Sequence, residues 1–137
     1  MDYTSTKPTL YIIDGHNFVR SCLMAGPENE ETVTREFLDW LEEISGTETY
    51  RGSFFRVIFD GTYRPVGAIS RRALHVSFAE SVTADELIFE QAQYLHDNGE
   101  RVAVVTSDRR LQTDLREEGI KTIFCQKFYD KLNNLIK

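Results

Sequence analysis

Four acidic residues share one place in the hydrophobicity pattern, because each lies at or shortly after the end of a short apolar run. They are Asp14, Asp60, Asp85 and Asp108. If the apolar runs are parallel strands, all four carboxylates gather at one edge of one sheet, since the carboxyl ends of parallel strands share an edge. That edge is where open α/β sheets bind their ligands. The placement of these acids therefore constrains both the fold and the chemistry.

Strand-like and helix-like segments alternate along the chain, which predicts an α/β fold: a doubly wound parallel sheet with helices on both faces. The expected strands cover residues 9–13, 53–59, 74–78, 102–106 and 120–125. The expected helices cover residues 32–44, 84–96 and 110–117, with a turn of helix near 19–23 and a last short helix within 127–137. The 137 residues suit a single domain over residues 9–137, preceded by a disordered or irregular stretch at 1–8.

The order of the five expected strands is 3-2-1-4-5, given right-handed crossovers. The connector at residues 61–72 is expected to be irregular, because it contains two glycines, a proline and three arginines. In this order Asp14 and Asp108 flank the crevice where the topology switches direction, and Asp60 lies one strand away. Asp85 reaches the same crevice from the first turn of a helix.

Each acid also has a purely structural interpretation. The two Asp-Gly pairs at 14–15 and 60–61 are typical of turns, and Ser107 or Asp108 is a candidate N-cap. Residues 83–86, Thr-Ala-Asp-Glu, match the capping box, with the threonine as the cap. Taken singly, each acid favours the structural interpretation. Their shared position after strands, with none before a strand, favours a common function.

Crowded carboxylates repel each other by about 1 kcal/mol per pair in water and by several-fold more near a protein surface. A divalent cation relieves this repulsion, and oxygen-rich carboxylate sites suit Mg²⁺ or Mn²⁺. Such ions support phosphodiester hydrolysis by lowering the pKa of a bound water. The sequence therefore predicts that the four acids hold Mg²⁺ or Mn²⁺ and act in catalysis.

Polar and basic residues near the four acids are candidates for binding a substrate. They are Asn17, Tyr63, Arg64, Arg71, Arg72, Thr106, Ser107, Arg109 and Arg110. Arginine grips phosphate with its forked donors, and tyrosine stacks on bases. We expect all five arginines at the acid-bearing edge, with solvation or neutralisation of the acids as the alternative role. His16 is a candidate proton donor, although a lone loop histidine is more commonly just solvated.

The net charge of −6 argues against a protein that grips nucleic acid by overall electrostatics. A bound nucleic acid then needs a local basic strip or a partner that delivers it. No apolar run approaches the roughly 18 residues of a membrane span, and residues 1–8 lack the features of a secretory signal. Two scattered cysteines make no disulfide framework. We therefore expect a cytoplasmic protein with no membrane partner.

Four stretches of the sequence, taken in order, resemble the signature of a known family. They are residues 11–17 (YIIDGHN), 57–61 (VIFDG), 81–86 (SVTADE) and 104–108 (VVTSD). The set resembles the NYN domains, in the YacP-like branch of the PIN-like nuclease superfamily, over about residues 10–124. The resemblance implies a PIN-like fold and a metal-dependent endoribonuclease whose substrate is structured or ribosome-associated RNA.

The resemblance also implies roles for single residues. The four acids match positions that hold Mg²⁺ or Mn²⁺ in the family, directly or through water, and Asn17 matches an asparagine beside the metal pocket. Two departures are expected to matter. His16 stands where the family usually has an aromatic residue, and a longer basic tail after Lys137 is absent.

Two other functions stay open at this point. The first is a binding module of the same fold that holds RNA or a protein partner without cutting, which the acidic net charge favours slightly. The second is a phosphoryl-accepting receiver domain, which also has an acidic pocket on a doubly wound sheet. A receiver needs a second acid beside Asp14 and a lysine after the fifth strand. Lys127 would supply the lysine, but residues 15–17 offer no second acid.

Overall fold

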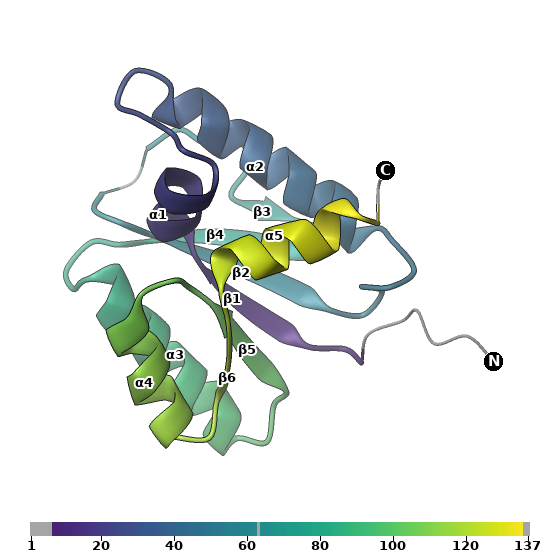
Figure 1. The fold of residues 1–137 in the computed structure, drawn as a ribbon, viewed down its shortest axis with the longest axis vertical. Helices are drawn as coiled ribbons and strands as arrows, with labels where there is room; N and C mark the ends of the chain where they lie inside the picture. The colour runs from purple at the N-terminus through teal and green to yellow at the C-terminus, as the bar shows by residue number, and fades with distance from the viewer. Residues whose placement is uncertain (1–6, 63, 136–137) are drawn as a thin grey trace.

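A six-stranded mixed sheet forms the centre of the computed structural model, which describes residues 7–62 and 64–135 (Figure 1). The strands are β1 (Leu10–Asp14), β2 (Phe54–Asp60), β3 (Ser70–Arg71), β4 (Leu74–Ala79), β5 (Val102–Val105) and β6 (Lys121–Ile123). They stand in the order β3-β4-β2-β1-β5-β6, and every neighbouring pair is parallel except β3 with β4. The helices are α1 (Gly15–Asn17), the π-helical turn η1 (Phe18–Cys22), α2 (Glu30–Ser45), α3 (Ala84–Asp97), α4 (Arg109–Glu117) and α5 (Cys125–Asn133).

The α/β class predicted from the sequence is confirmed, but the prediction of a wholly parallel, five-stranded sheet is wrong. β3 adds a sixth strand inside the connector that was expected to be irregular. A connection that leaves the carboxyl end of β2 must return to the amino edge of the sheet before β4 can run parallel to β2. Its last residues then fold back as a hairpin, in which Ser70 pairs with His75 and Arg71 with Leu74.

The end of the chain differs from the expected pattern in one further respect. Cys125 was expected to lie in the last strand, but β6 ends at Ile123 and Cys125 is the first residue of α5. Phe124 takes an extended conformation at the N-cap of this helix. The backbone N–H of Cys125 donates to the side chain of Ser107 rather than to a neighbouring strand. An apolar run that spans a strand and the start of a buried helix therefore looks like one longer strand in the sequence.

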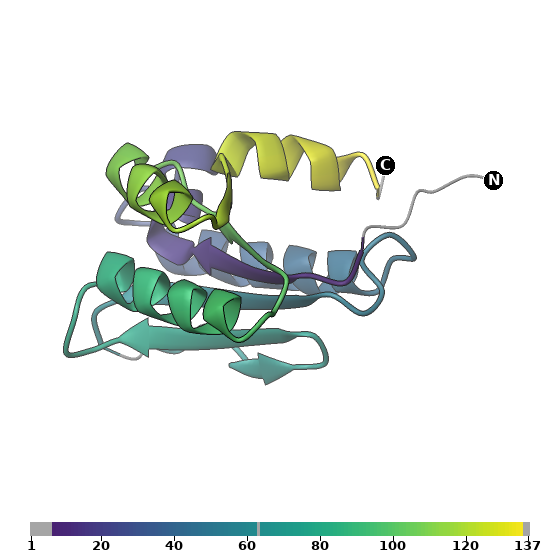
Figure 2. The ribbon, with the colours of Figure 1, turned by 90° about the horizontal axis from the view of Figure 1, so that it is seen from below.

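Two apolar clusters cover the two faces of the sheet, because successive strand residues point to opposite sides. Ile13 belongs to the cluster packed against α2, η1 and α5, whereas Ile12 belongs to the cluster packed against α3 and α4. Figures 1 and 2 show α2 and α3 on opposite sides of the strands. Helices on both faces leave the strand ends as the place where polar side chains gather.

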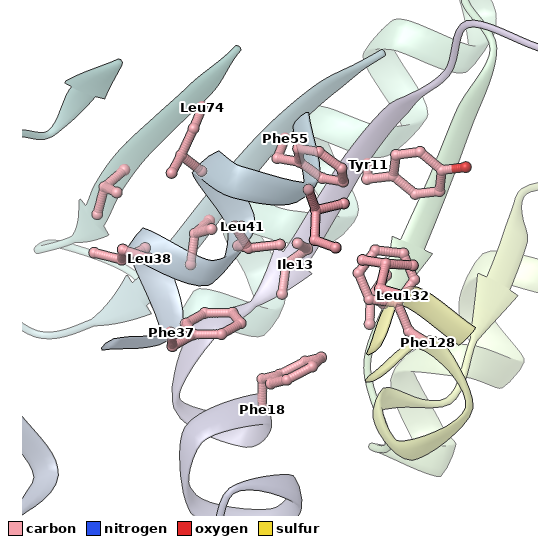
Figure 3. Packing of buried hydrophobic residues seen from close by; sticks show 14 of the residues in the cluster. Tyr11, Ile13, Phe18, Phe37, Leu38, Leu41, Phe55, Leu74, Phe128 and Leu132 are labelled. Carbon is pink, nitrogen blue, oxygen red and sulfur yellow. The ribbon is translucent and has the colours of Figure 1, made fainter. Parts of the chain in front are cut away.

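The larger cluster is rich in aromatic rings and fixes the short helical segment after β1. Phe18, the first residue of η1, is fully buried and stacks on Phe37 of α2 with ring centroids 4.7 Å apart. Figure 3 shows both rings in the same cluster as Phe128 of α5. Burial of rings of this size stabilises a fold strongly. The anchored Phe18 therefore holds the segment Asp14–Asn17 in place at the carboxyl edge.

Helix α3 begins with the capping box that the sequence predicts. The Thr83 hydroxyl accepts from the backbone N–H of Glu86, and the Glu86 carboxylate accepts from the backbone N–H of Thr83. Asp85 lies between them, so capping does not use it. In the described part of the chain, no helix has both the length and the apolar character that a membrane crossing requires.

Candidate active site

The four acids come from four different elements but lie at the same edge of the sheet. Asp14 and Asp60 are the last residues of β1 and β2, Asp85 is in the first turn of α3, and Asp108 is the N-cap of α4. Figure 1 shows α1 and the beginnings of α3 and α4 near the same end of the strands. Parallel strands and the helices that follow them bring these side chains together.

Asp14 is the most enclosed of the four acids, with 6% of its surface exposed. Its Oδ2 accepts a 3.0 Å hydrogen bond from the hydroxyl of Thr106, and the backbone N–H of Asn17 donates to the same carboxylate. Burial outweighs these hydrogen bonds and, with the charges of Asp85 and Asp60, raises the pKa of Asp14 to about 6. At neutral pH Asp14 is therefore ionised in surroundings that disfavour its charge.

Asp85 and Asp108 form a second crowded pair. Their carboxyl groups lie within hydrogen-bonding reach of each other, although Asp85 as a whole residue is exposed. Partial burial of its carboxyl group, followed by the charge of Asp108, raises the pKa of Asp85 to about 6. Asp108 also caps α4, since its Oδ1 accepts a 3.0 Å hydrogen bond from the backbone N–H of Leu111. Capping therefore restrains the Asp108 carboxylate that interacts with Asp85.

Asp60 is exposed, but a short hydrogen bond holds its side chain. Its Oδ1 accepts a 2.6 Å hydrogen bond from the backbone N–H of Ala84, which ties the end of β2 to the beginning of α3. Its charge contributes to the raised pKa values of both Asp14 and Asp85. Asp60 therefore both positions Asp85 and adds to the negative field at this edge.

Thr106 connects the two strands that flank the crevice. It is fully buried, and its hydroxyl donates to Asp14 while accepting a 3.1 Å hydrogen bond from the backbone N–H of Asp108. The side chain of Gln112, also buried, donates to the Thr106 carbonyl at 2.7 Å. Sequence reasoning missed Gln112, because a glutamine one turn into an amphipathic helix gives no signal of burial.

Asn17 and Ser107 organise the loops beside the acids. The Asn17 Oδ1 accepts from the backbone N–H of Ser107 at 2.7 Å and from the thiol of Cys125 at 3.2 Å. The Ser107 hydroxyl accepts from the backbone N–H of Cys125 at 3.2 Å. These contacts join α1, the loop after β5 and the beginning of α5 into one rigid unit.

His16 and Arg64 contact each other next to Asp60. One terminal nitrogen of Arg64 lies 2.9 Å from His16 Nε2, and the other donates to the carbonyls of Asp60 and Thr62. The guanidinium also lies over the Phe78 ring, 5.1 Å from its centroid. Burial, and then the charges of the neighbouring arginines, lowers the pKa of His16, so its ring is neutral at neutral pH. The sequence identifies His16 and Arg64 separately as candidate functional residues, but it does not predict that they contact each other.

The expected position of two arginines is wrong. Arg71 and Arg72 lie in and after β3, at the amino edge of β4, because the connector has already returned across the sheet. The Arg71 side chain is 10% exposed and contacts the carboxylates of Asp39 and Glu42 on α2. Among the other candidates, Arg109 and Arg110 are exposed in the first turn of α4, beside the acids. Tyr63 lies outside the described residues.

The chemistry of the donor set fits a hard divalent cation. Within residues 7–62 and 64–135, no three Asp, Glu, His or Cys side chains are arranged to hold one ion together. The acids interact as pairs instead: Asp14 with Asp60 and Asp85, and Asp85 with Asp108. Mg²⁺ commonly keeps several waters and uses one or two carboxylates, so pairs of this kind match its needs.

The fold and the acid-bearing edge together define the class of this protein as a PIN-like nuclease fold. Two crystal structures of Rae1 (YacP) from Bacillus subtilis are similar to it. A Trp-to-Leu mutant has a TM-score of 0.70 and 22% identity, covering 93% of this chain and 76% of the other. A second Rae1 structure has a TM-score of 0.71 and 20% identity, covering 92% and 74%. At these identities the likeness concerns the fold alone.

The YacP-like NYN domain model matches residues 11–137, and the chain belongs to this family. The match covers all four acids. The resemblance recognised from the ordered motifs is thereby confirmed. No curated protein matches the sequence significantly.

Proposed function

We propose that this protein is a metal-dependent endoribonuclease that hydrolyses RNA phosphodiester bonds. One observation carries the proposal: four carboxylates from separate elements are held together at the carboxyl edge, and two of them have pKa values raised to about 6. Such crowding opposes folding unless a cation balances it. Membership of the YacP-like NYN family supports the same chemistry.

The residues that would hold Mg²⁺ or Mn²⁺ are Asp14, Asp60, Asp85 and Asp108. When bound, the ion supplies a water of lowered pKa and neutralises charge on the phosphate. Asp85, the more accessible member of its pair with Asp108, would accept a proton from the attacking water. Thr106 keeps Asp14 directed into the crevice through its hydrogen bond.

Basic groups at the same edge would orient the RNA strand. Arg64 presents a guanidinium fixed by backbone carbonyls and His16, which limits the entropy lost when it grips a phosphate. Arg109 and Arg110 add exposed charge from the first turn of α4. The substrate prediction of structured or ribosome-associated RNA in the cytoplasm, with the ribosome as a partner, comes from the family resemblance and belongs to this proposal.

Purified protein should cleave single-stranded RNA in the presence of Mn²⁺ or Mg²⁺ and should stop on addition of EDTA. The double substitution Asp14→Asn and Asp108→Asn should abolish cleavage while leaving the far-ultraviolet circular dichroism spectrum unchanged. Cleavage that survives in this variant would place the chemistry elsewhere or in a contaminant.

A second candidate function is an RNA-binding module that does not cut. The net charge of −6 favours it slightly, because it opposes tight binding of RNA at an edge that must also hold a cation. Titration with Mn²⁺ separates the two functions, because a silent module shows no ion binding that depends on the acids. A wild-type protein that binds RNA, binds no Mn²⁺ and leaves RNA intact would establish the module.

A further inference from the structure

Five cationic side chains line one groove on a protein whose net charge is −6. The groove has a volume of about 710 Å³ and runs beside the edge strand β6, between the end of α4 and α5. Its cations are Arg101, Arg116, Lys121, Lys127 and Lys131. Glu100 also lines it, so positive charge exceeds negative charge there. We call this surface the basic groove.

The cations of the basic groove are not neutralised by neighbouring acids. On and beside α2, Arg35, Arg51 and Arg71 each contact a carboxylate. In the part of the chain that the structure describes, no groove cation forms such an ion pair. Arg101 and Arg116 donate to threonine hydroxyls instead, at 3.2 and 3.1 Å. Their positive charge is therefore available to an anionic ligand.

Aromatic rings complete the lining. Tyr11 and Phe128 pack with their ring centroids 5.5 Å apart, and both line the groove. Figure 3 shows the Tyr11 hydroxyl directed away from the apolar cluster. Phe124, with 43% of its surface exposed, lines the groove after β6. An exposed ring among cations suits a nucleobase and its phosphate, as in single-strand binding.

The basic groove reaches the acid-bearing edge at Phe124. The backbone N–H of the next residue, Cys125, donates to the side chain of Ser107, which directly precedes Asp108. The opposite approach is unfavourable to RNA, because the groove between α3 and α4 is lined by four acids and one arginine. These residues are Asp85, Glu86, Glu90, Asp114 and Arg110. For a polyanion, the side of β6 is therefore a more favourable approach to the acid-bearing edge than the groove between α3 and α4.

We propose that the basic groove binds the backbone of single-stranded RNA and delivers another part of the same strand to the acid-bearing edge. This inference rests on the proposed ribonuclease function. It assigns binding to one surface and chemistry to another. Removing charge from the groove should weaken the binding of long RNA, and it should leave the cleavage of fragments too short to span both surfaces unchanged.

The test measures RNA binding without cleavage. Asp14→Asn protein in EDTA is titrated into a fluorescent oligouridylate of about 20 nucleotides, and anisotropy is recorded at several salt concentrations. The groove variant is Lys127→Gln with Lys131→Gln. The matched control is Arg35→Gln with Arg51→Gln, which removes the same charge from exposed side chains that are paired with acids. All four positions are exposed, so the fold should persist, as circular dichroism will check.

The groove variant should raise the dissociation constant on the order of tenfold and reduce the salt slope by about 1.4, at about 0.7 per phosphate contact. The control should change the dissociation constant by less than about twofold. Equal losses in both variants would overturn the proposal, because bulk charge would then explain binding. Displacement of the RNA by oligoglutamate at equal charge would assign the groove to an acidic protein instead.

The same proteins distinguish this inference from the proposed function. Groove-dependent binding by a wild-type protein that never cleaves RNA would refute the nuclease and leave the groove in place. Cleavage of long RNA with unchanged KM in the groove variant would refute the groove and leave the nuclease in place.

Discussion

The acid-bearing edge and the basic groove each concentrate charge of one sign, negative at the edge and positive in the groove. Both lie at the border of the same sheet. At the acid-bearing edge, burial and the charges of neighbouring acids together raise the pKa values of Asp14 and Asp85 to about 6. In the basic groove the cations are exposed and spread over the elements that border β6.

The difference indicates what each region is built to hold. Enclosed carboxylates cost free energy and suit a small, strongly charged ion that repays the cost. Exposed, separated cations cost little and suit an extended polyanion that contacts several of them at once. The surface of α2, where arginines contact acids, has neither property. Arginines on this surface are therefore suitable control positions for mutations in the two charged regions.

The largest effect on RNA cleavage should come from substituting Asp85. This substitution tests whether the acid-bearing edge is the catalytic site. Asp85→Asn should lower the rate of RNA cleavage on the order of 100-fold, in the range of losses for positioned acid–base groups. Glu86→Gln is the control, since Glu86 neighbours Asp85 but serves the capping box. Glutamine also completes a capping box, so the variant should lose only the effect of a negative charge near the helix N-terminus, about 0.3–1 kcal/mol of stability. Its cleavage rate should stay within about twofold of wild type. Similar rates for the two variants would contradict the assignment.

Stability as a function of pH tests whether the crowding is costly without metal. Asp14 has a folded pKa of about 6 against an ordinary value of 3.8, so the native state binds more protons between these pH values. The free energy of unfolding in EDTA should therefore fall as pH rises from about 4 to 6, by on the order of 2 kcal/mol.

Urea denaturation at pH 4 and pH 7 measures this change. Asp14→Asn should flatten the dependence, and Mn²⁺ should restore stability at pH 7. If wild type and Asp14→Asn show the same pH dependence of the free energy of unfolding, ionising Asp14 does not destabilise the fold.

Thr106 tests how far the edge depends on one buried hydroxyl. Thr106→Val removes the donor to Asp14 and the acceptor for the Asp108 backbone N–H, and should cost on the order of 1 kcal/mol. Thr106→Ser keeps the hydroxyl and is the matched control. Thermal unfolding of both variants gives the comparison, and equal stabilities would mean that the hydroxyl is dispensable.

The smallest effect should come from Arg71, which tests the control surface of α2. Arg71→Gln should lower stability by roughly 0.5 kcal/mol and leave cleavage unchanged, because Arg71 faces α2 at the amino edge. Arg64→Gln, at the acid-bearing edge, should raise the KM for RNA several-fold. Steady-state cleavage of one RNA substrate by both variants gives their KM values and shows whether only Arg64 contributes to RNA binding. A raised KM in the Arg71→Gln variant would show that Arg71 takes part in binding the RNA substrate.

The sequence predicts the α/β class, the capping box of α3 and the family, because these depend on short-range patterns. Alternating apolar runs define the strands, and Thr83 with Glu86 defines a helix start within four residues. The position of Arg71 could not be predicted in the same way. It depends on where the connector returns across the sheet, which no local pattern records. The contact between His16 and Arg64 likewise joins residues 48 positions apart.

The sequence by itself determined which chemical groups the chain carries and that its acids follow strands, because hydrophobic periodicity and motif order are written locally. Only the tertiary structure decided how those groups are paired, which arginines face the acids, and that scattered lysines and arginines converge beside β6. The reason is physical: charge acts through space over several ångströms, and the distances between these groups are set by how the helices and strands pack.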